Sequence, residues 1–294
     1  MPDVRAIAET RARRPSAIAE AAAARRRPDS PLGEAGQLLV VAADHPARGL
    51  LGAGADPLAM ADRGDLLDRL CLALSRPGVG GVLGTPDVLE DLLLLGALDG
   101  KAVYGSMNRG GLAGTAFEID DRFTAYDAAA IEAMGLEGGK MLLRIDPTDP
   151  ATAPTLEACA RAVSELADRD LVAMVEPFMA HRVDGQLRVD LRTEAAIRAM
   201  TVAAGLGTSS ARTWLKIPVV EEMETVMAAT TLPALVLGGE VAADPDAAFD
   251  AWRRALELPT VVGLVVGRSL LFPHDGDVAA AVDTAASLLG GVPT

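Results

Sequence analysis

The sequence predicts an α/β protein built as a single (β/α)8 barrel, or TIM barrel, with a helical extension at its N-terminus. Three observations support this prediction. The chain has 294 residues, and α/β barrels routinely use such a length as one domain. Eight short apolar runs each precede a helical stretch, which is the pattern of parallel strands covered by helices. The first run ends in Asp44-His45-Pro46 and lacks the glycine-rich fingerprint that usually follows the first strand of an open doubly wound sheet.

The elements are expected in strict alternation. The expected strands are Leu38–Ala43, Val79–Leu83, Ala102–Gly105, Met141–Ile145, Leu171–Val175, Thr213–Ile217, Ala234–Leu237 and Val261–Val266. The helices that follow them are expected over Pro57–Arg76, Pro86–Leu98, Ala125–Met134, Thr155–Ala167, Thr193–Ala204, Glu221–Ala229, Pro245–Leu256 and Asp277–Leu289. Residues 1–36 are expected to form the helical extension and residues 37–294 the catalytic barrel.

Composition excludes several classes of protein. Half of the residues are hydrophobic and 23% are charged, which is typical of a folded chain. The net charge of −14 would repel nucleic acid, and no apolar run reaches the ~20 residues that span a bilayer. Two cysteines cannot make a disulfide scaffold. Acidic residues interrupt the Ala- and Arg-rich N-terminus, so we expect a helix there rather than a transit peptide, and a cytoplasmic protein.

In a barrel, functional side chains lie at the carboxyl ends of the strands. This rule gives a short set of candidates: Asp44, Thr85, Ser106, Arg144, Asp146, Glu176, Lys216, Gly238, Gly239, Glu240, Gly267 and Arg268.

Lys216 is the candidate nucleophile. Only three of the 27 basic residues are lysines, and strand alternation would place Lys216 and Trp214 inside the barrel. Burial and nearby cations lower the pKa of a lysine, and a neutral amine can form a Schiff base with a carbonyl group. The alternative is a structural ion pair with an inward carboxylate.

Glu176 ends the fifth expected strand, next to Lys216 in the barrel. Its carboxyl group suits general acid/base work, although it could instead only pair with Lys216 or Arg144. Lys140 and Arg144 share one face of the fourth strand; if that face points inward, they add positive charge near Lys216, whereas Lys140 could equally cap the barrel bottom. Asp44 could hold Lys216 or bind a substrate hydroxyl, while His45 is expected to face away.

Two glycine clusters predict a phosphate site. Gly238-Gly239 and Gly267-Arg268 follow the last two strands, where barrels frequently bind phosphate through backbone N–H groups. Arg268 would add a forked cationic donor, and Arg144 is a further candidate for binding the substrate or its phosphate. Alternatively, the glycines serve packing alone. Three histidines without ligand spacing argue against a zinc site, so neither a metal nor a cofactor is expected.

Together these motifs resemble the class I, Schiff-base aldolases that include archaeal-type fructose-bisphosphate, tagatose-bisphosphate and deoxyribose-phosphate aldolases. The resemblance covers roughly residues 37–290, and the pattern looks most like tagatose-bisphosphate aldolase. It rests on Ala42-Ala43-Asp44-His45-Pro46, Lys140-Met141-Leu142-Leu143, Glu176-Pro177, Leu215-Lys216-Ile217-Pro218, Gly238-Gly239-Glu240 and Gly263-Leu264-Val265-Val266-Gly267-Arg268.

The resemblance implies that Lys216 forms the Schiff base, that Glu176 is the acid/base group, and that Gly238, Gly239, Gly267 and Arg268 hold a substrate phosphate. It implies a phosphorylated ketose or keto acid as substrate and a homo-oligomer. The sequence has glycines where deoxyribose-phosphate aldolase has a second lysine in strand seven, which argues against that substrate. The archaeal enzymes use a tyrosine acid/base, and neither Tyr104 nor Tyr126 fits that place clearly. A sugar-phosphate isomerase or epimerase and a non-catalytic sugar-phosphate-binding barrel are the alternatives.

Overall fold

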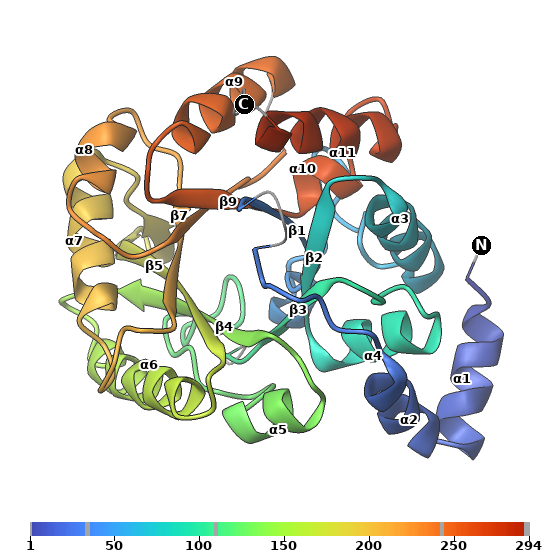
Figure 1. The fold of residues 1–294 in the computed structure, drawn as a ribbon. Helices are drawn as coiled ribbons and strands as arrows, with labels where there is room; N and C mark the ends of the chain where they lie inside the picture. Colours follow the sequence, from blue (N-terminus) through green and yellow to red (C-terminus); the bar gives the residue numbers. More distant parts are fainter. Residues whose placement is uncertain (1, 33–35, 109–110, 242–243, 291–294) are drawn as a thin grey trace.

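A computed structural model describes residues 2–32, 36–108, 111–241 and 244–290 of the chain, and it confirms the predicted (β/α)8 barrel (Figure 1). The strands are β1 (Leu38–Ala42), β2 (Val79–Gly84), β3 (Ala102–Ser106), β4 (Gly138–Ile145), β5 (Val172–Val183), β6 (Gln186–Val189), β7 (Thr213–Pro218), β8 (Ala234–Leu237) and β9 (Val261–Val266). All of them except β6 pair in parallel, and pairing of β4 with β5 closes the ring.

Helices cover the outside of this ring (Figure 1). They are α3 (Arg63–Ser75), α4 (Pro86–Leu94), α5 (Ala128–Ala133), α6 (Thr152–Ala167), α7 (Thr193–Ala204), α8 (Met223–Met227), α9 (Pro245–Leu256), α10 (Arg268–Leu271) and α11 (Val278–Ser287). A short 3-10 turn, η1 (Pro46–Arg48), follows β1, and a second, η2 (Leu288–Gly290), follows α11.

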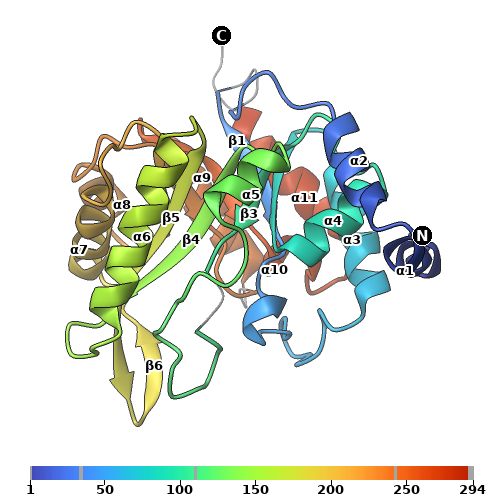
Figure 2. The ribbon, with the colours of Figure 1, turned by 90° about the horizontal axis from the view of Figure 1, so that it is seen from below.

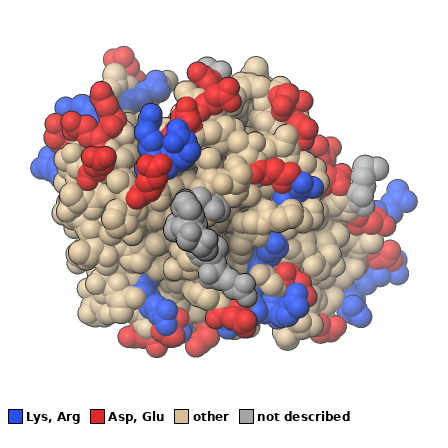
Figure 3. Space-filling model, turned by 45° about the horizontal axis from the view of Figure 1, so that its top comes forward, with Lys and Arg blue, Asp and Glu red and all other residues tan. Residues whose placement is uncertain are grey.

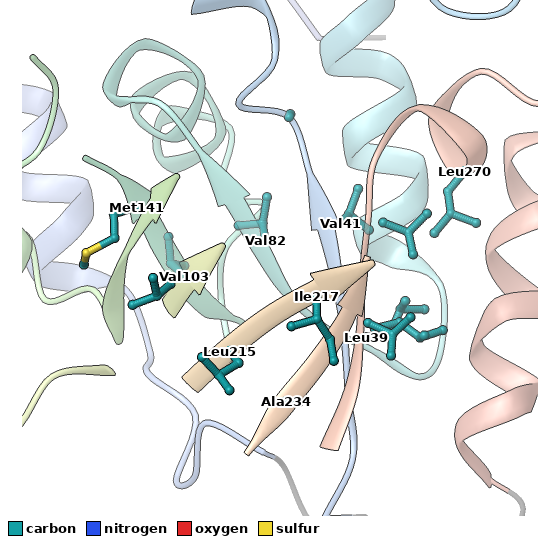
Figure 4. Packing of buried hydrophobic residues seen from close by; sticks show 14 of the residues in the cluster. Leu39, Val41, Val82, Val103, Met141, Leu215, Ile217, Ala234 and Leu270 are labelled. Carbon is teal, nitrogen blue, oxygen red and sulfur yellow. The ribbon is translucent and has the colours of Figure 1, made fainter. Parts of the chain in front are cut away.

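Alternation along the strands separates two buried layers. Leu39 and Val41 of β1 point outward and join the core under the helices, as do Leu215 and Ile217 of β7 (Figure 4). A second cluster fills the barrel interior: Leu38, Val40, Ala42, Leu83, Ala102, Tyr104, Val172, Met174, Trp214, Leu235 and Val265. Strand side chains alternate with a period of two, so this layering fixes which residues face the axis.

Some element boundaries differ from the sequence expectation. The helix expected from Pro57 begins at Arg63, because the Asp62 side chain accepts a hydrogen bond from the Asp65 N–H and caps the helix there. The helix expected to reach Leu98 ends at Leu94, shortly before Gly96 at φ +68°. A glycine in the left-handed region commonly ends a helix.

The sequence reasoning missed a hairpin. Strand β5 runs on to Val183 and pairs antiparallel with β6. Asp184 (φ 52°) and Gly185 (φ 78°) make the connection, and Asp-Gly is a strong signal for this type of two-residue turn. The hairpin projects beyond the end of the barrel towards which the strands point (Figure 2).

Two helices precede the barrel, α1 (Val4–Arg13) and α2 (Ser16–Ala24). They lie outside the ring of barrel helices (Figure 1), where Arg11 of α1 pairs with Glu90 and Asp91 of α4. The boundary predicted at residue 36 stays a prediction, and it adjoins residues 33–35, which lie outside the described residues.

The surface mixes both signs of charge. On the face drawn in Figure 3, acidic and basic side chains are interspersed around an area covered mainly by uncharged residues. Among the residues that the structure describes, none belongs to a helix long and apolar enough to cross a membrane.

Candidate active site

A cavity of about 790 Å³ opens at the carboxyl ends of the strands. Most of the predicted site residues line it: Asp44, Lys140, Glu176, Lys216, Gly238, Gly239, Glu240, Gly267 and Arg268. Four candidates from the strand ends do not line it: Thr85, Ser106, Arg144 and Asp146. The lining residues come from separate strands and loops, so the barrel fold is what brings them together.

Lys216 lies on the inner side of β7. Its strand neighbours Leu215 and Ile217 belong to the outer core, and Trp214 belongs to the inner one, as alternation predicts. The Lys216 Nζ atom donates a hydrogen bond of 2.8 Å to Glu176 Oε1. The lysine is 4% exposed and still lines the cavity, so the ion pair stands at an opening rather than in the closed core.

Glu176 is shared by two lysines. Its Oε1 atom accepts from Lys216, and its Oε2 atom contacts the Lys140 ammonium group. Burial alone would raise the pKa of Glu176, but the charges and hydrogen bonds of Lys140 and Lys216 outweigh burial and hold this pKa well below its usual range. The side chain is therefore a carboxylate at neutral pH.

Lys140 lies inside the barrel and does not cap its bottom. Its Nζ atom is 3.1 Å from Asp44 Oδ2 and also contacts Glu176. The Ser106 hydroxyl donates to the same Asp44 oxygen at 3.3 Å. The positive charge of Lys140 is thus held by two carboxylates, and Asp44 is tied to Lys140 in this structure.

The predicted phosphate residues line another side of the cavity. A Cβ atom at Gly267 would come within 2.5 Å of the Ala42 carbonyl oxygen, and one at Gly238 within 2.5 Å of Val266 Cγ1, so both positions require glycine. Gly239 has a φ of +66°. The Nε atom of Arg268 is buried and has no hydrogen-bond partner among the described residues, which leaves a donor for an anion.

Arg144 lies elsewhere. Its Nε atom donates to Asp121 Oδ2 at 2.9 Å, its Nη2 to Asp121 Oδ1 at 2.7 Å, and its Nη1 to Glu118 Oε1 at 3.1 Å. The fork of this arginine is thus complemented by carboxylates of the segment after β3. The structure does not bring Arg144 to the cavity, so its placement gives no support to a direct contact with phosphate.

His45 is a cavity residue that the sequence reasoning missed. It was expected to face away, but it lines the cavity, and its Nδ1 atom is 3.8 Å from Asp44 Oδ1. Strand alternation does not apply to it, because β1 ends at Ala42. Burial, and then the charges of Arg268 and Lys216, lower the pKa of His45 to about 3, so the imidazole is neutral at ordinary pH.

The cavity is more basic than the rest of the molecule. Five cationic side chains line it: Arg48, Lys140, Arg188, Lys216 and Arg268. Three acidic ones oppose them: Asp44, Glu176 and Glu240. On a chain of net charge −14, this local excess of positive charge favours an anionic ligand.

A family model described as Cgl0159-like matches residues 36–286. The chain belongs to the Cgl0159-like family. A solved structure of this family, Cgl0159 from Corynebacterium glutamicum, is 55% identical, with a TM-score of 0.94 and coverage of 97% of this chain and 96% of that one. No curated protein matches the chain.

The Cgl0159-like barrel is also similar in fold to class I aldolases. An archaeal fructose 1,6-bisphosphate aldolase has a TM-score of 0.66 at 18% identity, over 94% of this chain and 100% of that one. A Schiff-base-forming fructose-1,6-bisphosphate aldolase has a TM-score of 0.65 at 18% identity, over 92% and 99%. At this identity the likeness establishes the barrel fold and not the reaction.

Proposed function

We propose that this chain is a class I aldolase that cleaves a phosphorylated ketose or keto acid, with Lys216 as the Schiff-base lysine and Glu176 as the acid/base group. Candidate substrates include a ketose bisphosphate and 2-deoxy-5-keto-gluconate 6-phosphate. The observation that carries the proposal is the Lys216 amine, which lies 2.8 Å from a carboxylate in the wall of a cavity of about 790 Å³.

The two lysines have different surroundings. Lys140 contacts both Asp44 and Glu176, so its positive charge is well compensated. This fixed charge lies beside Lys216 and disfavours a second ammonium group there. Lys216 is therefore the amine that can release its proton and act as a nucleophile.

The steps of the proposed reaction balance without a cofactor. The Lys216 ammonium group passes its proton to Glu176, and the free amine adds to the substrate ketone. Glu176 then gives this proton to the carbinolamine hydroxyl group, which leaves as water, so that an iminium ion forms and Glu176 is again a carboxylate. Glu176 then accepts the proton of the substrate hydroxyl, the carbon–carbon bond breaks, and its electron pair neutralises the iminium to an enamine. Glu176 returns the proton to the enamine carbon, and water releases the ketone product and Lys216.

Glu176 also provides electrostatic stabilisation in this scheme. The iminium carries the positive charge that the Lys216 ammonium group carries in the resting site, and the carboxylate already faces that position at 2.8 Å. A charge that develops opposite a preorganised partner costs little reorganisation. The Arg268 side chain and the Gly238, Gly239 and Gly267 backbone would hold the phosphate.

Borohydride trapping tests the proposal. Reduction of the protein with dihydroxyacetone phosphate should add the mass of the ligand, less one water and plus two hydrogens, to the peptide that contains Lys216. The Lys216→Met variant should form no adduct and lose at least ~1000-fold in turnover, because the covalent route is gone. Lys101→Met is the matched control, since Lys101 donates instead to the Val79 carbonyl oxygen at 2.7 Å.

An adduct on another lysine, or full turnover by Lys216→Met, would overturn the aldolase mechanism. An isomerase or epimerase would keep its activity without Lys216. A barrel that only binds sugar phosphates would show a thermal shift with ligand but neither adduct nor exchange of substrate protons.

A further inference from the structure

Arg48 is a buried cation in the cavity wall that the proposed reaction does not use. It ends the η1 turn after β1, is 8% exposed and lines the same cavity as Lys216. Its Nε atom donates to the Gly111 carbonyl oxygen at 3.0 Å. Its Nη2 atom is 3.6 Å from Glu118 Oε1.

The positive charge of Arg48 is only weakly compensated. Glu118 lies closer to Arg144, at 3.1 Å, and Asp121 holds Arg144 as well. Burial, and then repulsion by Arg144, lower the pKa of Arg48. A buried cation whose nearest carboxylate is shared with a second arginine is costly unless a ligand neutralises it.

Arg48 and Arg268 belong to different parts of the cavity wall. The segment that Arg48 contacts, Gly111 to Glu118, connects β3 to β4, whereas Arg268 follows β9. In the ring, β3 and β9 stand on opposite sides of β1. Arg268 and Lys216 are the main charges that act on His45. Arg144, Asp121, Glu118 and, more weakly, Glu176 of the lysine centre act on Arg48.

We propose that Arg48 binds a second anionic group of the substrate, across the Lys216 centre from the phosphate at Arg268. The inference rests on the proposed function for the Lys216 site and narrows its substrate class. The substrate then carries an anion at each end of its carbon chain, and a ketose with a single phosphate is disfavoured. The second anion is a phosphate or a carboxylate, both of which a planar guanidinium group binds through two hydrogen bonds.

Calorimetric binding of unreactive ligands tests the assignment without any chemistry. The ligands are hexane-1,6-diol bisphosphate, the phosphate ester of 6-hydroxyhexanoate, and hexyl phosphate, which has one anion. A charge-assisted hydrogen bond contributes roughly tenfold or more in affinity. We therefore expect at least one doubly anionic ligand to bind roughly tenfold more tightly than hexyl phosphate, and the better one identifies phosphate or carboxylate as the second group.

The variants locate that gain. Arg48→Met should remove the advantage of the doubly anionic ligand and leave the affinity for hexyl phosphate near that of the wild type. Arg48→Lys keeps the positive charge but not the two parallel N–H donors, so it should retain part of the advantage of the doubly anionic ligand. It also controls for a folding defect in Arg48→Met. Arg188→Met is the matched control, because Arg188 is an exposed arginine at the same cavity.

Three results would overturn the assignment: equal binding of all three ligands, an equal loss for all ligands in Arg48→Met and Arg48→Lys, or loss of the advantage in Arg188→Met alone. The outcome is independent of catalysis. If borohydride traps nothing on Lys216, the aldolase proposal fails, while these affinities still decide whether Arg48 binds an anion.

Discussion

At the scale of single residues, the charges that surround each ionisable side chain of the site decide whether it carries a proton. Glu176 accepts from one lysine on each oxygen. Asp44 contacts Lys140 and adds the second negative charge that the two lysines need. Strand alternation in the sequence predicts that the side chains of Lys140, Glu176 and Lys216 point into the barrel. The sharing of one carboxylate does not follow, because it depends on distances between β4, β5 and β7 that only the closed barrel sets.

His45 should make the stability of the protein depend on pH. In the unfolded chain this imidazole binds a proton below its ordinary pKa of 6.5, whereas in the folded protein it does so only below about 3. Between these values the unfolded state binds more protons. The contribution of His45 to the free energy of unfolding is therefore fully present above pH 6.5 and is lost progressively as the pH drops towards 3. Within this range the site should contribute up to about 1.4 kcal/mol per pH unit.

Urea denaturation at about pH 7.5 and about pH 5 measures this effect. His45→Gln should lose less free energy of unfolding between the two pH values than the wild type, by roughly 1–2 kcal/mol. His274→Gln, at an exposed position, should keep the wild-type dependence. If His45→Gln and the wild type change equally, His45 is not held neutral by its surroundings.

At the scale of elements, periodicity predicted the barrel well and the loops poorly. Each expected strand has a counterpart in the ring, because short apolar runs between helices have few other solutions. The hairpin of β5 and β6 was not predicted, although Asp184-Gly185 is a sequence signal for its turn. The fifth strand was expected to end where its apolar run ends. The ion pairs of Arg144 could not be predicted for a related reason, because its partners Asp121 and Glu118 belong to a loop without periodicity.

Gly267 joins β9 to α10 where the backbone passes close to β1. Gly267→Ala would bring a Cβ atom within 2.5 Å of the Ala42 carbonyl oxygen and 3.1 Å of His45 Cε1. Because backbone atoms cannot yield easily, we expect a loss of roughly 1–3 kcal/mol in the free energy of unfolding and a weaker affinity for hexyl phosphate.

Gly205→Ala is the control for this substitution. A Cβ atom there meets nothing closer than 3.6 Å, so chemical denaturation should show little change, or a slight gain. Wild-type stability and phosphate affinity in Gly267→Ala would mean that the turn between β9 and α10 adapts and that glycine is not required.

At the scale of the whole molecule, the N-terminal segment is tied to the barrel end opposite the cavity. Arg25 follows α2, and its guanidinium group is 3.0 Å from Glu137 Oε1 in a pair whose side chains are 2% and 5% exposed. Glu137 precedes β4, and its Oε2 atom accepts from the Val103 N–H. Arg27 adds a contact of 2.8 Å from the solvent side.

Loss of Arg25 should therefore destabilise the barrel without changing its chemistry. Arg25→Met leaves a buried carboxylate with one exposed cation, Arg27, beside it. Removal of one member of a buried pair costs about 3–5 kcal/mol. Because Arg27 remains, we expect a loss of roughly 2–3 kcal/mol in urea denaturation. Borohydride trapping on Lys216 should be unchanged under native conditions, because the cavity lies at the other end of the strands.

Three further variants isolate the buried pair. Arg13→Met, at an arginine whose side chain is 80% exposed, should change the free energy of unfolding by no more than about 0.5 kcal/mol. Arg25→Met combined with Glu137→Gln should recover part of the loss, because the unpaired charge is removed together with its partner. Glu137→Gln alone completes the comparison. If the loss of unfolding free energy in the double variant equals the sum of the losses in Arg25→Met and Glu137→Gln, the two side chains do not stabilise each other. Arg25 then stabilises the barrel through its contacts with the Lys101 and Gly135 carbonyl oxygens.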